Sequence, residues 1–235
     1  MTMSRIIKSD FEELTSFVKN YTLTNVMCEQ DFLEFLSSIH KKFYSYLVLI
    51  EEYRLLIDQD KNVPIIGETQ FEYLQESMSD CGQCLFLAIN GCYRGAHLLL
   101  RSSIENFLKG ISLDEVPQII KEKNVYQVFD DAETVDVFSK TKFNIELHNI
   151  YSELCMDAHT IDINHMAGVS ALRFFPNFDK KAAKRFASLY VRLLPIFVTA
   201  LCLKYNTHFH SINYLNKEVI TASIISGFKA SVYGE

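Results

Sequence analysis

The sequence predicts an all-α protein that folds as a helical bundle, and three observations support this. The 235-residue chain contains only 8 Gly and 4 Pro, too few for the frequent turns of a β-sandwich. Hydrophobic residues make up 49% and charged residues 22%, a globular balance that argues against a largely disordered chain. Apolar residues recur at every third and fourth position in most segments, which is the helical period.

Two helices are predicted near the N-terminus. The pattern predicts a short amphipathic helix over 5–20 and a longer helix over about 30–58. A loop follows and contains Pro64, which breaks a helix. We therefore expect an N-terminal helical pair over 1–62 that packs on a helical bundle over 63–235. At this length the two parts are expected to form one compact unit.

The second part of the chain is predicted to open with one long helix over about 69–110. Gly91 and Gly95 lie inside it, at a spacing that lets another helix pack closely, although each glycine costs about 1 kcal/mol relative to alanine. Gly110 is expected to end the helix as its C-cap.

The remaining chain is also predicted to be mostly helical. In order, we expect a short helix over 113–123, an ambiguous acidic stretch over 125–142, a helix over 143–160, an irregular stretch over 160–179, an apolar helix over 179–205 and a short helical tail over 212–235. The longest apolar run, Leu193–Leu203, is much shorter than the about 20 residues that span a bilayer. The run therefore predicts a core helix, which Pro195 is expected to kink, and no membrane partner.

The net charge of −6 and the pI of about 5.7 disfavour a protein that coats nucleic acid with its whole surface. A local basic groove remains compatible with this charge. The densest basic group is interpreted as a solvated helix face; it comprises Lys180, Lys181, Lys184 and Arg185.

The cysteines indicate a reducing compartment. The sequence begins with charged residues where the apolar core of a signal peptide would stand, which predicts a cytoplasmic protein with free thiols. Cys81 and Cys84 form a single CxxC motif without a second Cys/His pair at the usual spacing. We therefore expect buried thiols rather than a zinc site, and no cofactor.

A narrow polar stripe runs along the predicted long helix. At 100° per residue, five polar residues fall within an arc of about 80°; they are Asn90, Arg94, His97, Arg101 and Glu105. The stripe is either the wet face that every bundle helix needs or a functional group of charges among apolar flanks. Both interpretations stay open at this point.

The predicted helix over 143–160 gathers polar side chains on one face; these are His148, Tyr151, Ser152, Cys155 and His159. As metal ligands the two histidines are poorly spaced, because three helical turns separate them by about 16 Å. A nucleophilic pair of Cys155 and His159 is conceivable, although no third orienting group is visible.

A second interpretation uses the end of the same helix. Asp157, His159, Asp162 and His165 offer nitrogen and oxygen ligands close together in the sequence. A weaker alternative is therefore a helical enzyme that binds a metal or another cofactor at these four residues.

Two segments resemble a known superfamily. One is Leu98-Leu-Leu-Arg101-Ser-Ser-Ile-Glu105 and the other is Tyr151-Ser-Glu-Leu154-Cys-Met-Asp-Ala-His159. Together they resemble the HEPN superfamily of prokaryotic helical proteins, over roughly residues 70–205. The resemblance implies an all-helical, often dimeric domain of a toxin–antitoxin, abortive-infection or antiphage system. Many members are endoribonucleases that need no metal.

The resemblance implies a role for each matching residue. His159 would be the acid/base, Arg101 the phosphate clamp and Glu105 the residue that orients Arg101. Tyr151 would form a hydrogen bond to the phosphate or to the imidazole. His97 would be a second acid/base.

This sequence departs from the superfamily pattern, in which a His follows an Arg about four to six residues later on one helix; no Arg here has a His at that distance. The site is then either assembled across helices or non-catalytic.

The leading expectation is thus a cytoplasmic HEPN-like protein that cuts RNA without a metal. The alternative is a non-catalytic interaction module in which the same residues form a structural network. The site requires Arg101, Glu105 and His159 to lie on facing helices. A symmetric homodimer is also expected, because the apolar helix over 186–203 and the Gly91/Gly95 surface offer packing area. A protein partner encoded nearby would fit a toxin or defence system.

Overall fold

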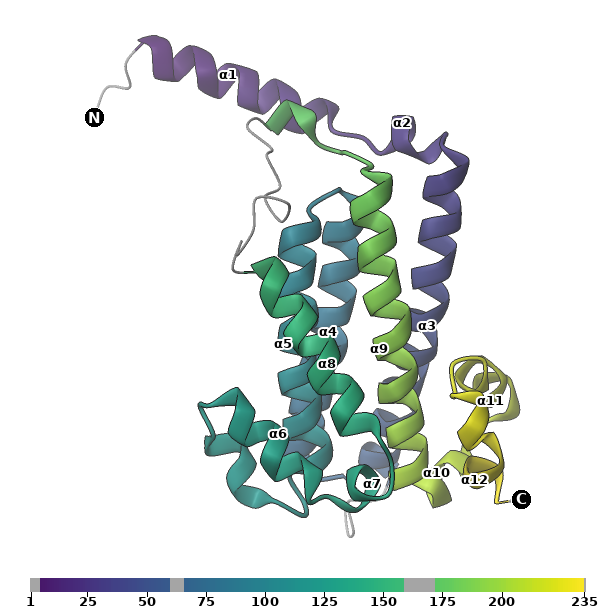
Figure 1. Cartoon of the computed structure of the whole chain (residues 1–235). Helices are drawn as coiled ribbons and strands as arrows, with labels where there is room; N and C mark the ends of the chain where they lie inside the picture. The colour runs from purple at the N-terminus through teal and green to yellow at the C-terminus, as the bar shows by residue number, and fades with distance from the viewer. Residues whose placement is uncertain (1–4, 60–65, 159–171, 235) are drawn as a thin grey trace.

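The computed structural model describes residues 5–59, 66–158 and 172–234, and these residues form helices and no strand. The predicted all-α bundle is confirmed. Five long helices run side by side (Figure 1); they are α3 (Gln30–Gln59), α4 (Glu68–Ile89), α5 (Tyr93–Ser112), α8 (Phe143–Ala158) and α9 (Lys180–Lys204). Three of them match their predicted ranges closely, namely those over 30–58, 143–160 and 179–205.

The other elements stand at the two ends of the bundle. In chain order these are α1 (Arg5–Asn20), α2 (Thr24–Met27), η1 (Pro117–Lys121), α6 (Val125–Glu133), α7 (Asp136–Ser139), η3 (Leu172–Phe174), α10 (Asn206–Ser211), α11 (Tyr214–Thr221), η4 (Ser226–Phe228) and α12 (Lys229–Tyr233). The acidic stretch over 125–142, ambiguous in the sequence, thus contains the two helices α6 and α7.

The prediction of one long helix over 69–110 is wrong, because the chain reverses at Gly91 and two helices, α4 and α5, pack along each other. Gly91 has φ of 80°, a left-handed conformation that favours glycine. A Cβ atom at this position would also collide with the backbone carbonyl of Asn177. The glycine that was interpreted as a helix-packing residue is therefore the turn itself.

Gly110 does not end α5, which continues to Ser112, so the C-cap prediction is also wrong. A Cβ atom at Gly110 would lie 2.8 Å from the Cγ atom of Leu74, so the missing side chain lets α4 and α5 approach closely.

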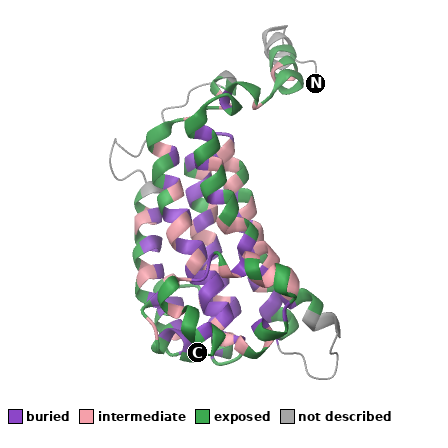
Figure 2. Ribbon diagram, turned by 90° about the vertical axis from the view of Figure 1, so that its right-hand side faces the viewer, coloured by how far each residue is buried: buried purple, intermediate pink, exposed green. Residues whose placement is uncertain are grey.

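Aromatic rings fill the centre of the bundle, and buried residues line the inner faces of its helices (Figure 2). The rings of Phe107 on α5 and Phe197 on α9 stack with their centroids 3.9 Å apart, and Tyr46 on α3 packs against Phe197. Helix α3 packs against α9, α4 and α11. The longer helix of the N-terminal pair therefore shares the core with the rest of the chain.

Helix α9 is long and apolar enough to cross a membrane, yet 67% of its most apolar window is buried inside the bundle. This burial is what a core helix requires, and it covers most of the apolar surface that suggested a homodimer. The helix begins at an N-cap, where the Asp179 carboxylate accepts hydrogen bonds from the backbone of Lys181 and Ala182, each at 2.9 Å.

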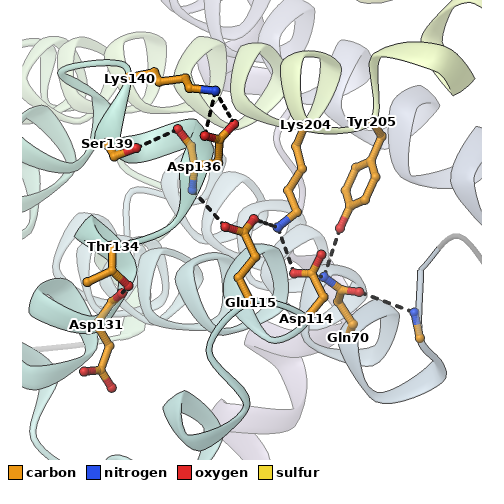
Figure 3. A network of polar contacts seen from close by, with 11 residues as sticks. Gln70, Asp114, Glu115, Asp131, Thr134, Asp136, Ser139, Lys140, Lys204 and Tyr205 are labelled. Carbon is orange, nitrogen blue, oxygen red and sulfur yellow. Dashed lines mark hydrogen bonds and ion pairs between the residues drawn. The ribbon is translucent and has the colours of Figure 1, made fainter.

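A network of ion pairs closes one end of the bundle (Figure 3). The Lys204 ammonium at the end of α9 donates to Asp114 at 2.8 Å and to Glu115 at 2.7 Å. Gln70 on α4 donates to Asp114 at 3.2 Å and to the Tyr205 hydroxyl at 2.9 Å. This Lys204 network ties the loop after α5 to α4 and α9.

Candidate functional site

Three of the predicted site residues meet between α5 and α8. Arg101 and Glu105 are one turn apart on α5, with Arg101 Nε 3.8 Å from Glu105 Oε1. The Tyr151 hydroxyl, on α8, donates to the same Glu105 oxygen at 2.8 Å. The Arg101 guanidinium carbon lies 5.7 Å from the centroid of the Tyr151 ring, a cation–π distance. We call these three residues the Arg101 cluster.

The Arg101 cluster is half-buried, and this sets its electrostatics. The side chains of Arg101 and Glu105 are 29% and 35% exposed. Burial raises the pKa of Tyr151 and the hydrogen bond to Glu105 raises it further, so the hydroxyl remains a donor at neutral pH. The Nε atom of Arg101 is buried and has no hydrogen-bond partner within the described part of the chain. The guanidinium is therefore held by charge and ring contact without having all its donors used.

A carboxyl group that the sequence interpretation missed lies next to the Arg101 cluster. Asp80 on α4 is buried, and Asn106 on α5 donates to its Oδ2 atom at 3.0 Å. Burial raises the pKa of Asp80; hydrogen bonds from Ser102 and Asn106 oppose the rise, whereas the charges of Glu76 and Glu105 add to it. Asp80 is thus a carboxyl group that favours its protonated form more than an exposed aspartate does.

The misplaced helix break explains why Asp80 was missed. In one straight helix, Asp80 and Asn106 would be about 39 Å apart, because each residue rises about 1.5 Å. The reversal at Gly91 brings them within a hydrogen bond. The contact between Asp80 and Asn106 could have been predicted only by placing a helix break at Gly91.

A hollow of about 620 Å³ opens beside Glu105. Its charged lining comprises Glu105, Lys109, Lys121, Glu122 and Lys123, and its apolar lining comprises Ile120, Val125 and Val128. We call it the lysine hollow. The Lys109 ammonium on α5 donates to the backbone carbonyl of Glu122 at 3.1 Å, which fixes one cation at the wall. The lining therefore carries three cations and two carboxylates in a chain whose net charge is −6.

The two described histidines on these helices have other neighbours. His97 on α5 is buried, and its ring stacks on Phe186 of α9 with centroids 5.8 Å apart. It thus packs against α9, whereas Arg101 packs against α8. His148 on α8 lies against Phe129, with ring centroids 5.0 Å apart.

Part of the predicted site lies outside the described residues. These are His159, Asp162 and His165; Asp157 belongs to the last turn of α8, but its side chain is not described. The proximity of His159 to Arg101 stays a prediction, as does the metal alternative. The part of the chain that the structure describes contains no cluster of three or more residues suited to a metal ion.

The CxxC cysteines are buried in α4, as expected. Burial raises the pKa of Cys81 to about 12 and raises that of Cys84 as well. A thiol with so high a pKa is a poor nucleophile and metal ligand at neutral pH. The motif therefore belongs to the core.

No protein-family model, curated protein or solved structure matches this chain. The resemblance to the HEPN superfamily therefore depends on the two motifs alone. Chemically, the described site presents a guanidinium held by a carboxylate and a tyrosine, a buried carboxyl and a cationic hollow. Such a set suits a phosphate-bearing ligand, because guanidinium and ammonium groups bind phosphate oxygens by charge-assisted hydrogen bonds.

Proposed function

We propose that the chain is a HEPN-like endoribonuclease that cleaves RNA without a metal. The proposal depends on one observation: the Arg101 guanidinium, held by Glu105 and Tyr151, is half-buried, and the same Glu105 lines a hollow that contains three lysines. Holding a cation before the substrate arrives lowers the cost of stabilising charge in the transition state. The neighbouring lysines supply attraction for the flanking phosphates.

The proposed reaction needs one base and one phosphate clamp. The 2′-oxygen of the RNA attacks the adjacent phosphorus while its proton passes to His159, an imidazole suited to proton transfer near neutral pH. The bond from phosphorus to the 5′-oxygen breaks, and the leaving oxygen takes a proton from water. Arg101 stabilises the charge on the phosphate, and Glu105 and Tyr151 hold Arg101 in place. His97 has no part in this proposal, because its ring is buried against α9.

The setting of the protein is part of the proposal. A cytoplasmic toxin or defence protein that acts on RNA would be kept silent by a partner, and a protein encoded nearby is the natural candidate. A symmetric homodimer also belongs to this proposal. Helix α9 no longer argues for it, because most of its apolar window is buried within one chain. Light scattering at micromolar concentrations tests it directly.

A second candidate function is a non-catalytic interaction module. The hydrogen bond of 2.8 Å from Tyr151 to Glu105 favours it, since this bond joins α5 to α8 whether or not RNA is bound. In this case the Arg101 cluster would stabilise the bundle and leave RNA intact.

The decisive experiment compares matched variants on labelled RNA in the presence of EDTA. Arg101→Ala is paired with Arg192→Ala, because Arg192 also binds carboxylates, bonding Glu146 at 2.8 Å and Glu153 at 3.0 Å between α9 and α8. His159→Ala is paired with His40→Ala, an exposed histidine on α3.

The proposal expects the wild type and both control variants to cleave RNA in EDTA. Arg101→Ala and His159→Ala should keep their fold and lose cleavage. A wild type that leaves RNA intact, together with a destabilised Arg101→Ala variant, would favour the interaction module. Cleavage that disappears in EDTA would favour the metal alternative at Asp157, His159, Asp162 and His165.

A further inference from the structure

An exposed aromatic ring stands next to the lysine hollow in the sequence. Tyr126 is 63% exposed and directly follows Val125, one of the lining residues. Its ring centroid lies 6.0 Å from that of His148 on α8. Tyr126 belongs to a helix, α6, rather than to a loop.

The local geometry holds Tyr126 at the start of α6. The Asn124 side chain accepts a hydrogen bond from the Tyr126 backbone amide at 3.1 Å and so caps the helix. Behind Tyr126, the ring of His148 packs edge-on against the buried Phe129, with centroids 5.0 Å apart. The exposed Tyr126 ring therefore rests against the half-buried His148 ring, one residue along the chain from the lining of the lysine hollow, and we call these two rings the aromatic platform.

We infer that the lysine hollow and this aromatic platform bind a single strand of nucleic acid, which is RNA if the proposed function holds. The phosphates would contact Lys121 and Lys123, while a base would stack on Tyr126. Stacking of this kind needs an exposed base face, which a duplex hides inside its stack. The negative charge of the whole chain also disfavours a protein that holds a duplex by backbone contacts alone.

The lysine hollow is separate from the residues that take part in bond breaking. Glu105 belongs to both the Arg101 cluster and the lining of the hollow, so the two lie side by side. A strand anchored in the hollow would therefore present a neighbouring phosphodiester to Arg101. The hollow is expected to set affinity and Arg101 to set the rate of cleavage.

The test measures binding by fluorescence anisotropy with a labelled single-stranded RNA of about 12 nucleotides. The same sequence as a duplex is the comparison ligand. The first variant is the double substitution Lys121→Gln with Lys123→Gln. Its matched control is Lys181→Gln with Lys184→Gln, which removes the same charge from the exposed start of α9. The second variant is Tyr126→Ala, and melting curves verify that every variant is folded.

We expect wild type to bind the single strand more tightly than the duplex. The hollow variant should lower the slope of log affinity against log salt by about 1.4, which corresponds to two lost phosphate contacts at about 0.7 each. Tyr126→Ala should weaken binding about 5- to 150-fold, the range for loss of one stacked base. The control pair should change affinity far less than the hollow pair.

Equal effects of the hollow pair and the control pair would overturn the inference, as would tighter binding of the duplex. The binding result and the cleavage result are independent. Wild type that binds the single strand through these residues but never cleaves it would support the hollow and end the ribonuclease proposal. Continued RNA cleavage with unchanged affinity in both variants would overturn the inference about the hollow and support the ribonuclease proposal.

Discussion

The Arg101 cluster and the Lys204 network are built from the same kinds of side chain, yet they differ in how completely the cation is enclosed. The Lys204 side chain is 8% exposed, and its ammonium reaches two carboxylates at 2.7 and 2.8 Å. Arg101 is 29% exposed, its nearest carboxylate oxygen lies at 3.8 Å from Nε, and that nitrogen has no hydrogen-bond partner within the described residues.

This difference separates a structural contact from a candidate binding site. A cation with short bonds to two carboxylates has little left to offer a ligand, and its main effect is to join elements of the fold. The Arg101 side chain is partly exposed, and its partner Glu105 lines the lysine hollow, so its guanidinium can contact an incoming phosphate. We therefore expect that removing Lys204 lowers the stability of the fold, whereas removing Arg101 lowers the activity.

The largest effect is expected from Arg101→Ala on RNA cleavage. Loss of one group that stabilises developing charge typically lowers the rate by about 10²–10³, or about 2.7–4 kcal/mol. The free energy of unfolding should change by less than about 1 kcal/mol, because a partly exposed ion pair contributes little. Single-turnover cleavage and urea unfolding of the same preparation measure both quantities. A large loss of stability with unchanged cleavage would contradict the comparison.

The opposite result is expected for Lys204→Met. This variant leaves Asp114 and Glu115 without their shared cation and should lower the free energy of unfolding by about 1–3 kcal/mol. For a chain of this size, each kcal/mol corresponds to about 2–4 °C in Tm. RNA cleavage should remain at the wild-type level. Lys140→Met is the control, because Lys140 is exposed and its pairing with Asp136 should contribute less than about 1 kcal/mol.

Tyr151→Phe tests whether the Arg101 cluster also contributes to the fold. The substitution removes the hydroxyl that bonds Glu105 and keeps the ring under Arg101. One hydrogen bond of this kind contributes about 0.5–1.5 kcal/mol, so a loss of about 1 kcal/mol is expected in thermal or urea unfolding. Tyr44→Phe, at an exposed ring on α3, is the control and should leave stability unchanged. A loss of unfolding free energy well above 2 kcal/mol would indicate that the Arg101 cluster mainly stabilises the fold.

The smallest effect is expected from Asp80, and it depends on pH. The folded state raises the pKa of Asp80 above 3.8, so folding favours the protonated form. Its stabilising contribution is complete below that ordinary pKa and is lost as the pH rises through the folded value.

In Asp80→Asn this loss disappears, since an amide does not titrate. The free energy of unfolding of the variant, compared with that of the wild type, should therefore improve as the pH rises from about 3 to 7. Urea unfolding across this range measures the difference. A variant that instead loses stability toward neutral pH would show that the carboxylate, not the acid, is the favoured form.

The fold class was readable from the sequence because it follows from local physics. Few glycines and prolines, together with apolar residues at the helical period, determine that the chain forms helices and where most of the long ones begin, although not where α5 begins. The buried α9 and the pairing of Arg101 with Glu105 were equally predictable, since both depend on spacing along one helix.

Only the tertiary structure decided where the chain reverses and which helices pack against each other. Gly91 looked like one more residue of a long helix, and its left-handed conformation became evident only with Asn177 packed against it. That single reversal places Asp80 beside Asn106 and puts α4 against α5. Tyr151 was chosen from its motif, but its bond to Glu105 required α8 to pack on α5. The lysine hollow joins α5, η1 and α6, and contacts between separate elements leave no periodic trace in a sequence.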